Sequence, residues 1–102
     1  MGFGNMMKQA QKMQAKMAEM QEKLKDEELE ASAGGGTVKV TITGDLVIKS
    51  ITIDPSAVDP EDVELLQDMT TAAVNEALRA AQELQQRRVA DITGGMNIPG
   101  LM

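Results

Sequence analysis

The sequence predicts an α+β fold in which a long helix is followed by an antiparallel meander of two or three strands and then by a second long helix. Three patterns predict it: apolar residues recur at helical spacing near the N-terminus, alternate strictly across 37–43, and recur at helical spacing again after residue 60. The 102 residues fit one domain, 1–102. With one aromatic residue and nine methionines the core is thin, which favours a dimer.

The first helix is predicted over residues 5–27. Neither glycine nor proline interrupts residues 5–31. Within the predicted helix, apolar positions alternate between four- and three-residue spacing, which is the a/d seam of a heptad repeat and requires a partner helix. This methionine seam consists of Met6, Ala10, Met13, Met17, Met20 and Leu24.

The strand region begins with an ambiguity. Residues 29–33 alternate apolar and polar side chains, so they either form a short strand or continue the helix. After three glycines, residues 37–43 alternate cleanly and predict a strand. Residues 46–53 are β-branched and mostly apolar, as expected for a strand covered on at least one face. Between these two strands, Gly44-Asp45 predicts a two-residue hairpin turn of the primed kind.

The second helix is predicted over residues 60–91. Asp59 is suited to cap it, and Pro60 is suited to the first helical position. A Thr-Gly-Gly run ends the helix, and an apolar tail, 96–102, follows. The predicted packing face is rich in small residues, which permits a close approach to a neighbouring element; it comprises Val63, Leu66, Thr70, Ala73, Ala77, Ala80 and Leu84.

The chain contains no histidine and no cysteine. It therefore lacks the commonest general base, the most reactive nucleophile and the usual zinc ligands. We expect no enzymatic activity, no catalytic residues, no metal and no cofactor. The glycine run 34–36 lacks the lysine and the strand-loop-helix context of a phosphate-binding loop. No apolar run has the length of a membrane span or a signal peptide, so we expect a cytoplasmic protein without a membrane or small-molecule partner.

Charge is distributed unevenly along the chain. Residues 1–25 carry a net +3, residues 26–78 carry −10, and residues 79–102 carry +1. An ordinary exposed helix interleaves acids and lysines at four-residue spacing, because like-charge pairs at that spacing are destabilising. The first helix instead keeps one sign of charge over its first three turns, which favours an anionic partner. On a helical wheel four of its lysines fall together, away from the methionine seam: Lys8, Lys12, Lys16 and Lys23.

Periodicity and charge alone leave several interpretations of this lysine face open. The first interpretation is a solvated surface on a helix that serves only as a dimer seam. The second is a binding site for DNA or RNA, and the third is a surface that binds anionic lipid. The lipid interpretation is weakened because Phe3 is the only aromatic anchor. A different class of function, a protein-interaction module, would use the adaptable methionine seam together with the apolar residues 98–102.

Several short segments are each weak evidence of a family relationship, but their combination is specific. They lie in one order along essentially the whole chain: Gly4–Gln14, Lys16-Met17, Val38–Val40, Gly44, Ile53–Pro55, Ala72–Ala77, Thr93–Gly95 and Pro99-Gly100. In this combination the sequence resembles the YbaB/EbfC nucleoid-associated family. The resemblance implies an α-β-β-β-α subunit with 29–33 as the first of three antiparallel strands, and a homodimer with protruding helices. It also implies a bacterial protein that binds DNA in the nucleoid, alters its conformation and can affect gene expression.

The expected DNA contacts follow from the matching N-terminal motif and from helix geometry. Lysines would act as point charges on phosphates, and nothing in the sequence predicts a base-reading element, so we expect weak or shape-based specificity. The motif supplies Lys8, Lys12 and Lys16; position on the helix adds Lys23; and Arg87 and Arg88, near the end of the second helix, are secondary candidates.

Overall fold

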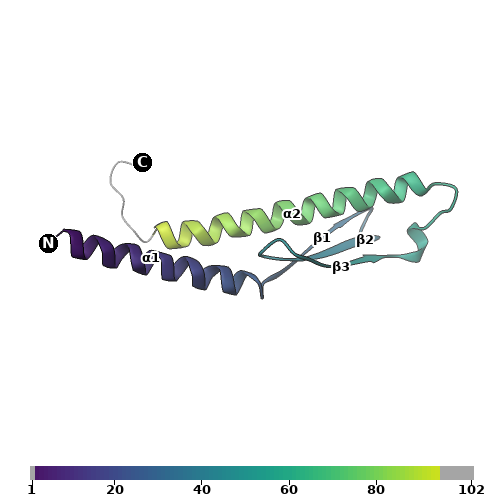
Figure 1. The fold of residues 1–102 in the computed structure, drawn as a ribbon. Coiled ribbons are helices and arrows are strands. Elements are labelled where there is room, and N and C mark those ends of the chain that lie inside the picture. Colours follow the sequence, from purple (N-terminus) through teal and green to yellow (C-terminus); the bar gives the residue numbers. More distant parts are fainter. Residues whose placement is uncertain (1, 95–102) are drawn as a thin grey trace.

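The computed structural model describes residues 2–94, and the predicted tail 96–102 lies outside them. The elements are α1 (Phe3–Leu24), β1 (Glu28–Ala33), β2 (Val38–Thr43), β3 (Ile48–Ile53), a short 3-10 helix η1 (Pro55–Ala57) and α2 (Val63–Gly94). This confirms the α-β-β-β-α order, including a strand at 29–33. The subunit is elongated, with extents of 71 × 27 × 15 Å (Figure 1). Neither of the two long helices, over the residues described, is apolar enough to cross a membrane.

The three strands form one antiparallel sheet with β2 in the centre. α2 lies across β1 and β2 (Figure 1). The core lies between them: Val38, Val40 and Ile42 of β2 alternate along the strand and are fully buried. They pack against small side chains of α2, which let the helix approach the sheet closely, as predicted. The buried residues of α2 are Ala73, Ala77, Ala81 and Leu84, so the packing face uses Ala81 where the sequence predicted Ala80.

Among the residues described, α1 packs against the rest of the subunit through its C-terminal half. Met20 and Leu24 are buried against Leu84 of α2. Towards the N-terminus the same seam emerges into solvent, and Met6 is 67% exposed. Figure 1 shows why, since the N-terminal end of α1 extends past the last described turn of α2. The predicted methionine seam therefore has a partner helix along only part of its length.

The bounds of α1 differ from the predicted 5–27. The helix begins two residues earlier because the carbonyl of Gly2 already accepts a hydrogen bond from the Met6 amide at 2.9 Å. It ends at Leu24, where the amide of Glu27 bonds back to the Leu24 carbonyl at 3.2 Å and the chain turns towards the sheet. The predicted helix extends through this turn because the sequence contains no glycine or proline there.

The start of α2 also differs from the prediction, and Asp59 is not its cap. The Asp59 carboxylate accepts from the Glu61 amide at 2.9 Å, so it stabilises a turn that contains Pro60. The helix begins three residues later, where the Asp62 carboxylate accepts from the Leu65 amide at 3.2 Å. Both aspartates make a capping type of hydrogen bond, but only the second one opens the helix.

Four residues, 44–47, separate β2 from β3, so the predicted two-residue primed turn is wrong. The Leu46 amide donates to the Thr43 carbonyl at 3.0 Å, and Leu46 itself has a φ of 69°. This is a turn followed by one left-handed residue. Gly44 has no positive φ. A Cβ there would lie 2.7 Å from Leu24 Cδ2 and 2.8 Å from the Leu24 carbonyl oxygen, so glycine is required by the close approach of α1.

Candidate nucleic-acid interface

Three lysines form an exposed row along the protruding part of α1. Lys8, Lys12 and Lys16 are all exposed. They are spaced four residues apart, so each step advances about 6 Å along one side of the helix. No acid precedes Glu19 in this helix, and within residues 2–94 none of the three lysines forms an ion pair. We call these three residues the lysine row; their charges are available to an external anion.

The fourth lysine of the predicted face has a different environment. Lys23 Nζ lies 3.1 Å from the Glu19 carboxylate one helical turn away. Lys25, which the helical wheel placed off the stripe, is paired with Glu22 at 3.1 Å. Positive charge in the C-terminal half of α1 is therefore balanced by neighbouring acids, and Lys23 would have to exchange Glu19 for a phosphate in order to bind DNA.

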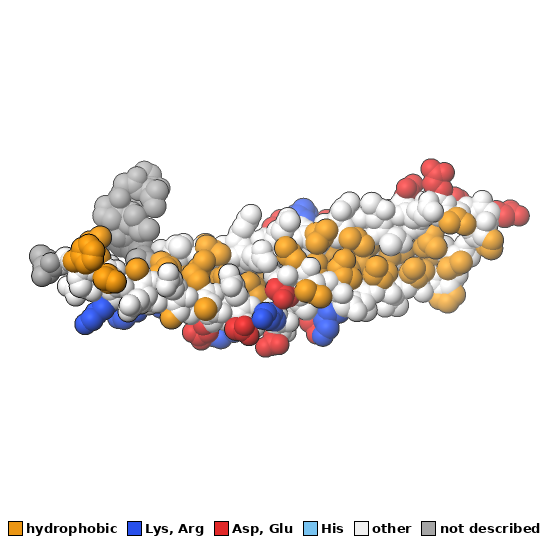
Figure 2. All heavy atoms as spheres, viewed as in Figure 1, with side chains coloured by type: hydrophobic (Ala, Val, Ile, Leu, Met, Phe, Trp, Pro, Cys, Tyr) orange, Lys and Arg blue, Asp and Glu red, His pale blue; other side chains and the backbone are white. Residues whose placement is uncertain are grey.

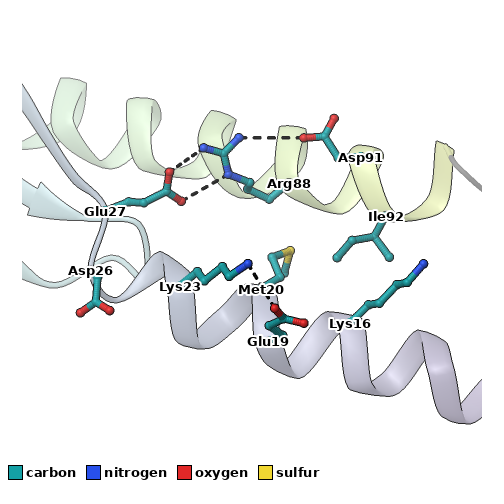
Figure 3. Close-up of a pocket in the computed structure, with 9 residues that line it drawn as sticks. All are labelled: Lys16, Glu19, Met20, Lys23, Asp26, Glu27, Arg88, Asp91 and Ile92. Atoms are coloured by element: carbon teal, nitrogen blue, oxygen red, sulfur yellow. Dashed lines mark hydrogen bonds and ion pairs between the residues drawn. The ribbon is translucent and has the colours of Figure 1, made fainter.

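A groove of about 580 Å³ separates the packed part of α1 from the end of α2 (Figure 3). Its apolar lining includes Met20 and Ile92, which face each other across it. Four carboxylates outnumber the three cations on its walls, so the groove itself is a poor site for a polyanion. The charged lining residues are Lys16, Glu19, Lys23, Asp26, Glu27, Arg88 and Asp91.

Arg88, one of the two predicted arginines, is engaged on both sides. Its Nη2 lies 2.5 Å from Glu27 Oε1, its Nε donates to Glu27 Oε2 at 3.3 Å, and its Nη1 lies 3.9 Å from Asp91 Oδ2 (Figure 3). The hydrogen bond from Arg88 lowers the pKa of Glu27, and the same bond raises the pKa of Arg88. Sequence reasoning missed this pair because its members stand 61 positions apart.

The other two arginines of α2 differ from each other. Arg87 is exposed, and it forms no ion pair in the part of the chain that the structure describes. Arg79 is held by Glu76 and by Glu83, the latter at 2.6 Å. Of the predicted arginines, Arg87 is thus the one free to meet an external anion. Neighbouring positions on a helix diverge by about 100°, so Arg87 and Arg88 do not act as one group.

Opposite charges gather at opposite ends of the subunit. Lysine side chains lie at the N-terminal end of α1, while acidic side chains cluster at the far end of the molecule, around the start of α2 (Figure 2). That acidic end lies beyond the sheet, at the opposite end of the long axis from the start of α1 (Figure 1). A polyanion would therefore be attracted to one end and repelled by the other; the acids at the second end are Asp59, Glu61, Asp62, Glu64 and Asp68.

Known proteins resemble this chain in sequence and in fold. Residues 1–96 match the YbaB/EbfC DNA-binding family. A nucleoid-associated protein of Moorella thermoacetica is 58% identical, over 98% of this chain and 99% of its own. One of Alkaliphilus metalliredigens is 56% identical, over 97% of this chain and 87% of its own. The crystal structure of an uncharacterized Helicobacter pylori protein superposes with a TM-score of 0.82 at 26% identity, over 92% of this chain and 99% of that one. The chain therefore belongs to the YbaB/EbfC DNA-binding family.

Proposed function

We propose that this protein binds DNA as a homodimer, mainly through the phosphate backbone. The observation that carries the proposal is the lysine row, three exposed cations without acidic partners in residues 2–94 of a chain that belongs to a DNA-binding family. Lysine ammonium groups interact with phosphates as point charges, and the binding energy comes largely from counterion release. Because α1 presents no arginine to a base edge, sequence specificity is weak or based on DNA shape.

The candidate DNA contacts can be ranked by whether a carboxylate of the described chain already pairs with them. Lys8, Lys12 and Lys16 are the primary contacts, because nothing in the described chain neutralises them. Arg87 is a secondary contact, and Lys23 contributes only by leaving Glu19. The names of the relatives, nucleoid-associated proteins, support a nucleoid location in the cytoplasm. Effects on DNA conformation and on gene expression belong to the same proposal.

The exposed apolar face of β3 supports the homodimer. Ile51 pairs with Val40, and Ile53 pairs with Val38, so these isoleucines lie on the same sheet face as the buried core. They are nevertheless 43% and 37% exposed, because α2 lies across β1 and β2. The sequence predicted a cover for this strand, and no element of the described chain provides one. A second copy of the subunit would supply it.

The exposed face continues beyond the strand. Figure 2 shows hydrophobic side chains in a continuous band along the half of the molecule that contains the sheet. A contiguous apolar surface of this kind is characteristic of a protein interface. A second copy fits best, since it would also bring a second lysine row to the same DNA. Other large apolar side chains that are exposed stand in the hairpin region, before α2 and in its first turn: Val47, Ile48, Val58, Val63 and Leu65.

The homodimer is tested by sedimentation equilibrium of the wild type and of Ile51→Lys. A lysine at this position would place an unpaired charge in the proposed interface, so we expect a dimer for the wild type and a folded monomer for the variant. Circular dichroism checks that the variant keeps its helices. A monomeric wild type, or a variant that dimerises as tightly as the wild type, would contradict this part of the proposal.

DNA binding is tested by fluorescence anisotropy across a salt series. A homodimer presents Lys8, Lys12, Lys16 and Lys23 twice; if about six of these charges engage phosphates, affinity falls roughly a thousandfold between about 50 and 200 mM salt. A flat salt dependence would contradict the electrostatic mechanism. A pull-down from lysate, with and without nuclease, covers the alternative function: protein partners that survive nuclease, with no DNA retained, would favour a protein-interaction module.

A further inference from the structure

We infer that Glu27 and Arg88 form a clamp that fixes the direction in which α1 leaves the body of the subunit. In this role Arg88 is a positioning residue for DNA binding and not a DNA contact. The inference rests on the proposed role of the lysine row, because a helix that carries no ligand would need no fixed direction. It goes beyond that role by assigning a function to two residues that lie outside the row.

The clamp is needed because, within residues 2–94, α1 is held only through its C-terminal half. Leu24, in its last turn, is 2% exposed and packs against Leu84. Just after it, the Gly44 amide donates to the Glu27 carbonyl at 2.8 Å. The Gly44 carbonyl in turn accepts from the Gln85 side chain at 2.9 Å. This junction joins α1, the β2–β3 hairpin and α2 within a few residues. Met20 adds a contact with α2 one turn earlier, and the N-terminal half of α1 takes its orientation from this packed half.

Arg88 holds the junction from the side of α2. The guanidinium meets the two carboxylate oxygens of Glu27 through two different nitrogens, at 2.5 and 3.3 Å (Figure 3). Such two-point contacts restrict rotation as well as distance, because the planar groups must stay aligned. Among the ion pairs of residues 2–94, this is the one that connects α2 to another part of the chain. The pairs of Arg79, by contrast, stay within α2.

Small changes at this junction are amplified along α1. Lys8 stands sixteen residues before Leu24, which is about 24 Å of helix at 1.5 Å per residue. A tilt of about 10° at the junction would move Lys8 by about 4 Å, whereas successive phosphates of one strand are separated by about 3.4 Å along the DNA axis. In a homodimer two such helices must meet one duplex together, so a loosely held α1 would spread the lysines over several phosphate registers.

The surroundings of Arg88 also argue against a direct contact with DNA. Its donors face Glu27 on one side and Asp91 on the other, and both are carboxylates that repel phosphate. To bind DNA it would have to give up the Glu27 hydrogen bonds that hold the pKa of that carboxyl below its ordinary value. Arg87 offers a charge at the same end of α2 without that cost.

The two roles predict opposite results for Glu27→Gln. If Arg88 positions α1, removing the carboxylate loosens the helix and weakens DNA binding, even though the protein becomes less acidic. If Arg88 contacts DNA, the same change frees it and strengthens binding. For the clamp we expect Glu27→Gln and Arg88→Gln each to weaken binding by about three- to thirtyfold. The salt slope should stay at the wild-type value, because no phosphate contact is lost.

Matched controls come from the other arginine network of α2. Arg79→Gln and Glu76→Gln make the same changes of charge at an exposed pair that does not leave the helix. They should leave affinity near the wild-type value. The exchange Glu27→Arg with Arg88→Glu rebuilds the pair with its charges reversed, and it should restore most of the lost affinity. A residue that acts only by its own charge would not be rescued in this way.

The direction of α1 can be measured without DNA. The chain has no cysteine, so spin labels at Gln11→Cys on α1 and Gln86→Cys on α2 would be the only ones in the subunit. The labelled protein is mixed with an excess of unlabelled protein, so that distances between labels on two different subunits do not contribute to the measured distribution. Glu27→Gln and Arg88→Gln should broaden the distance distribution, while Arg79→Gln should not. This measurement still tests the clamp if the protein fails to bind DNA, so failure of the clamp and failure of the proposed function are distinguishable.

Two results would overturn the clamp. The first is tighter DNA binding by Glu27→Gln together with a salt slope lowered by about 0.9 per subunit in Arg88→Gln, which would make Arg88 a phosphate contact. The second is an unchanged distance distribution in both clamp variants, which would show that the apolar junction alone fixes α1. Thermal unfolding and circular dichroism of each variant confirm that the measurements are made on folded protein.

Discussion

The two halves of α1 share one sequence pattern but have different surroundings. In the C-terminal half, Met20 and Leu24 are buried against α2, and Lys23 is paired with Glu19. In the N-terminal half, Met6 is exposed, and Lys12 has no acidic partner among the residues described. The periodicity that specifies the helix therefore does not specify what its faces contact. That depends on how far α2 extends alongside it.

The largest expected difference between the two halves is in stability. Leu24→Ala removes a side chain that is 2% exposed, so the free energy of unfolding should fall by about 2–5 kcal/mol. Met6→Ala removes one that is 67% exposed and should change it by less than about 0.5 kcal/mol. Urea unfolding at one fixed protein concentration measures both. Equal losses would show that a partner covers the N-terminal half.

A somewhat smaller effect is expected at the hairpin that supports the packed half. In Gly44→Ala the added Cβ would meet both the side chain and the carbonyl oxygen of Leu24 at less than 3 Å. Because a carbonyl oxygen of a helix cannot move aside cheaply, we expect a loss of about 1–3 kcal/mol. Gly35→Ala, where a Cβ has no neighbour within 4 Å, is a comparison without the clash, although its φ of +68° adds strain of its own. A loss at Gly44 no greater than at Gly35 would contradict the close approach.

The charged faces of the two halves should differ in DNA binding. Lys12→Ala removes an unpaired cation and should lower the salt slope by about 0.9 per subunit. Lys25→Ala removes a cation that is already paired with Glu22 and lies off the row. It should leave the slope near the wild-type value, as measured by anisotropy over the same salt series. Equal reductions in the two variants would mean that the basic segment 1–25 attracts DNA by its total charge alone.

The smallest effect concerns acid pH. Arg88 lowers the pKa of Glu27 below its ordinary value of 4.5, so the pair stabilises the fold above that value. This contribution is lost as the pH falls through the lowered pKa. We expect the melting temperature to fall in acid for the wild type, and Glu27→Gln to fall less steeply over the same range. Parallel curves would mean that the pair contributes nothing to pH-dependent stability.

Much of the fold could be predicted from the sequence, because its signals are local. Helical spacing identified both long helices, and strict alternation identified β2. Details that depend on geometry between elements could not be predicted. Asp59 and Asp62 both accept a capping type of hydrogen bond, and the sequence does not indicate which of the two opens the helix. Gly44 suggested a tight turn, whereas its neighbour is Leu24 of α1, twenty positions away in the chain.

For the candidate site, too, local features could be predicted from the sequence, whereas contacts between distant residues could not. The lysine row was visible in the sequence because residues four apart share a helix face, and the structure leaves that row exposed. The pairing of Arg88 with Glu27 was not visible, because a contact across 61 positions leaves no periodic signal. The exposed face of β3 could not be predicted either. Its apolar composition indicated a cover, and only the position of α2 shows that residues 2–94 of one chain do not supply it.

DNA binding by this protein is proposed to depend above all on the lysine row of α1, whose charges meet the DNA backbone. The most direct test is the salt dependence of DNA affinity for the wild type and for a variant with Lys8, Lys12 and Lys16 all changed to Ala. In a homodimer this removes six phosphate contacts, so we expect weaker binding to every sequence and a salt slope lower by about 5, with the oligomeric state unchanged. Wild-type affinity and slope in this variant would show that the DNA site lies elsewhere on the protein.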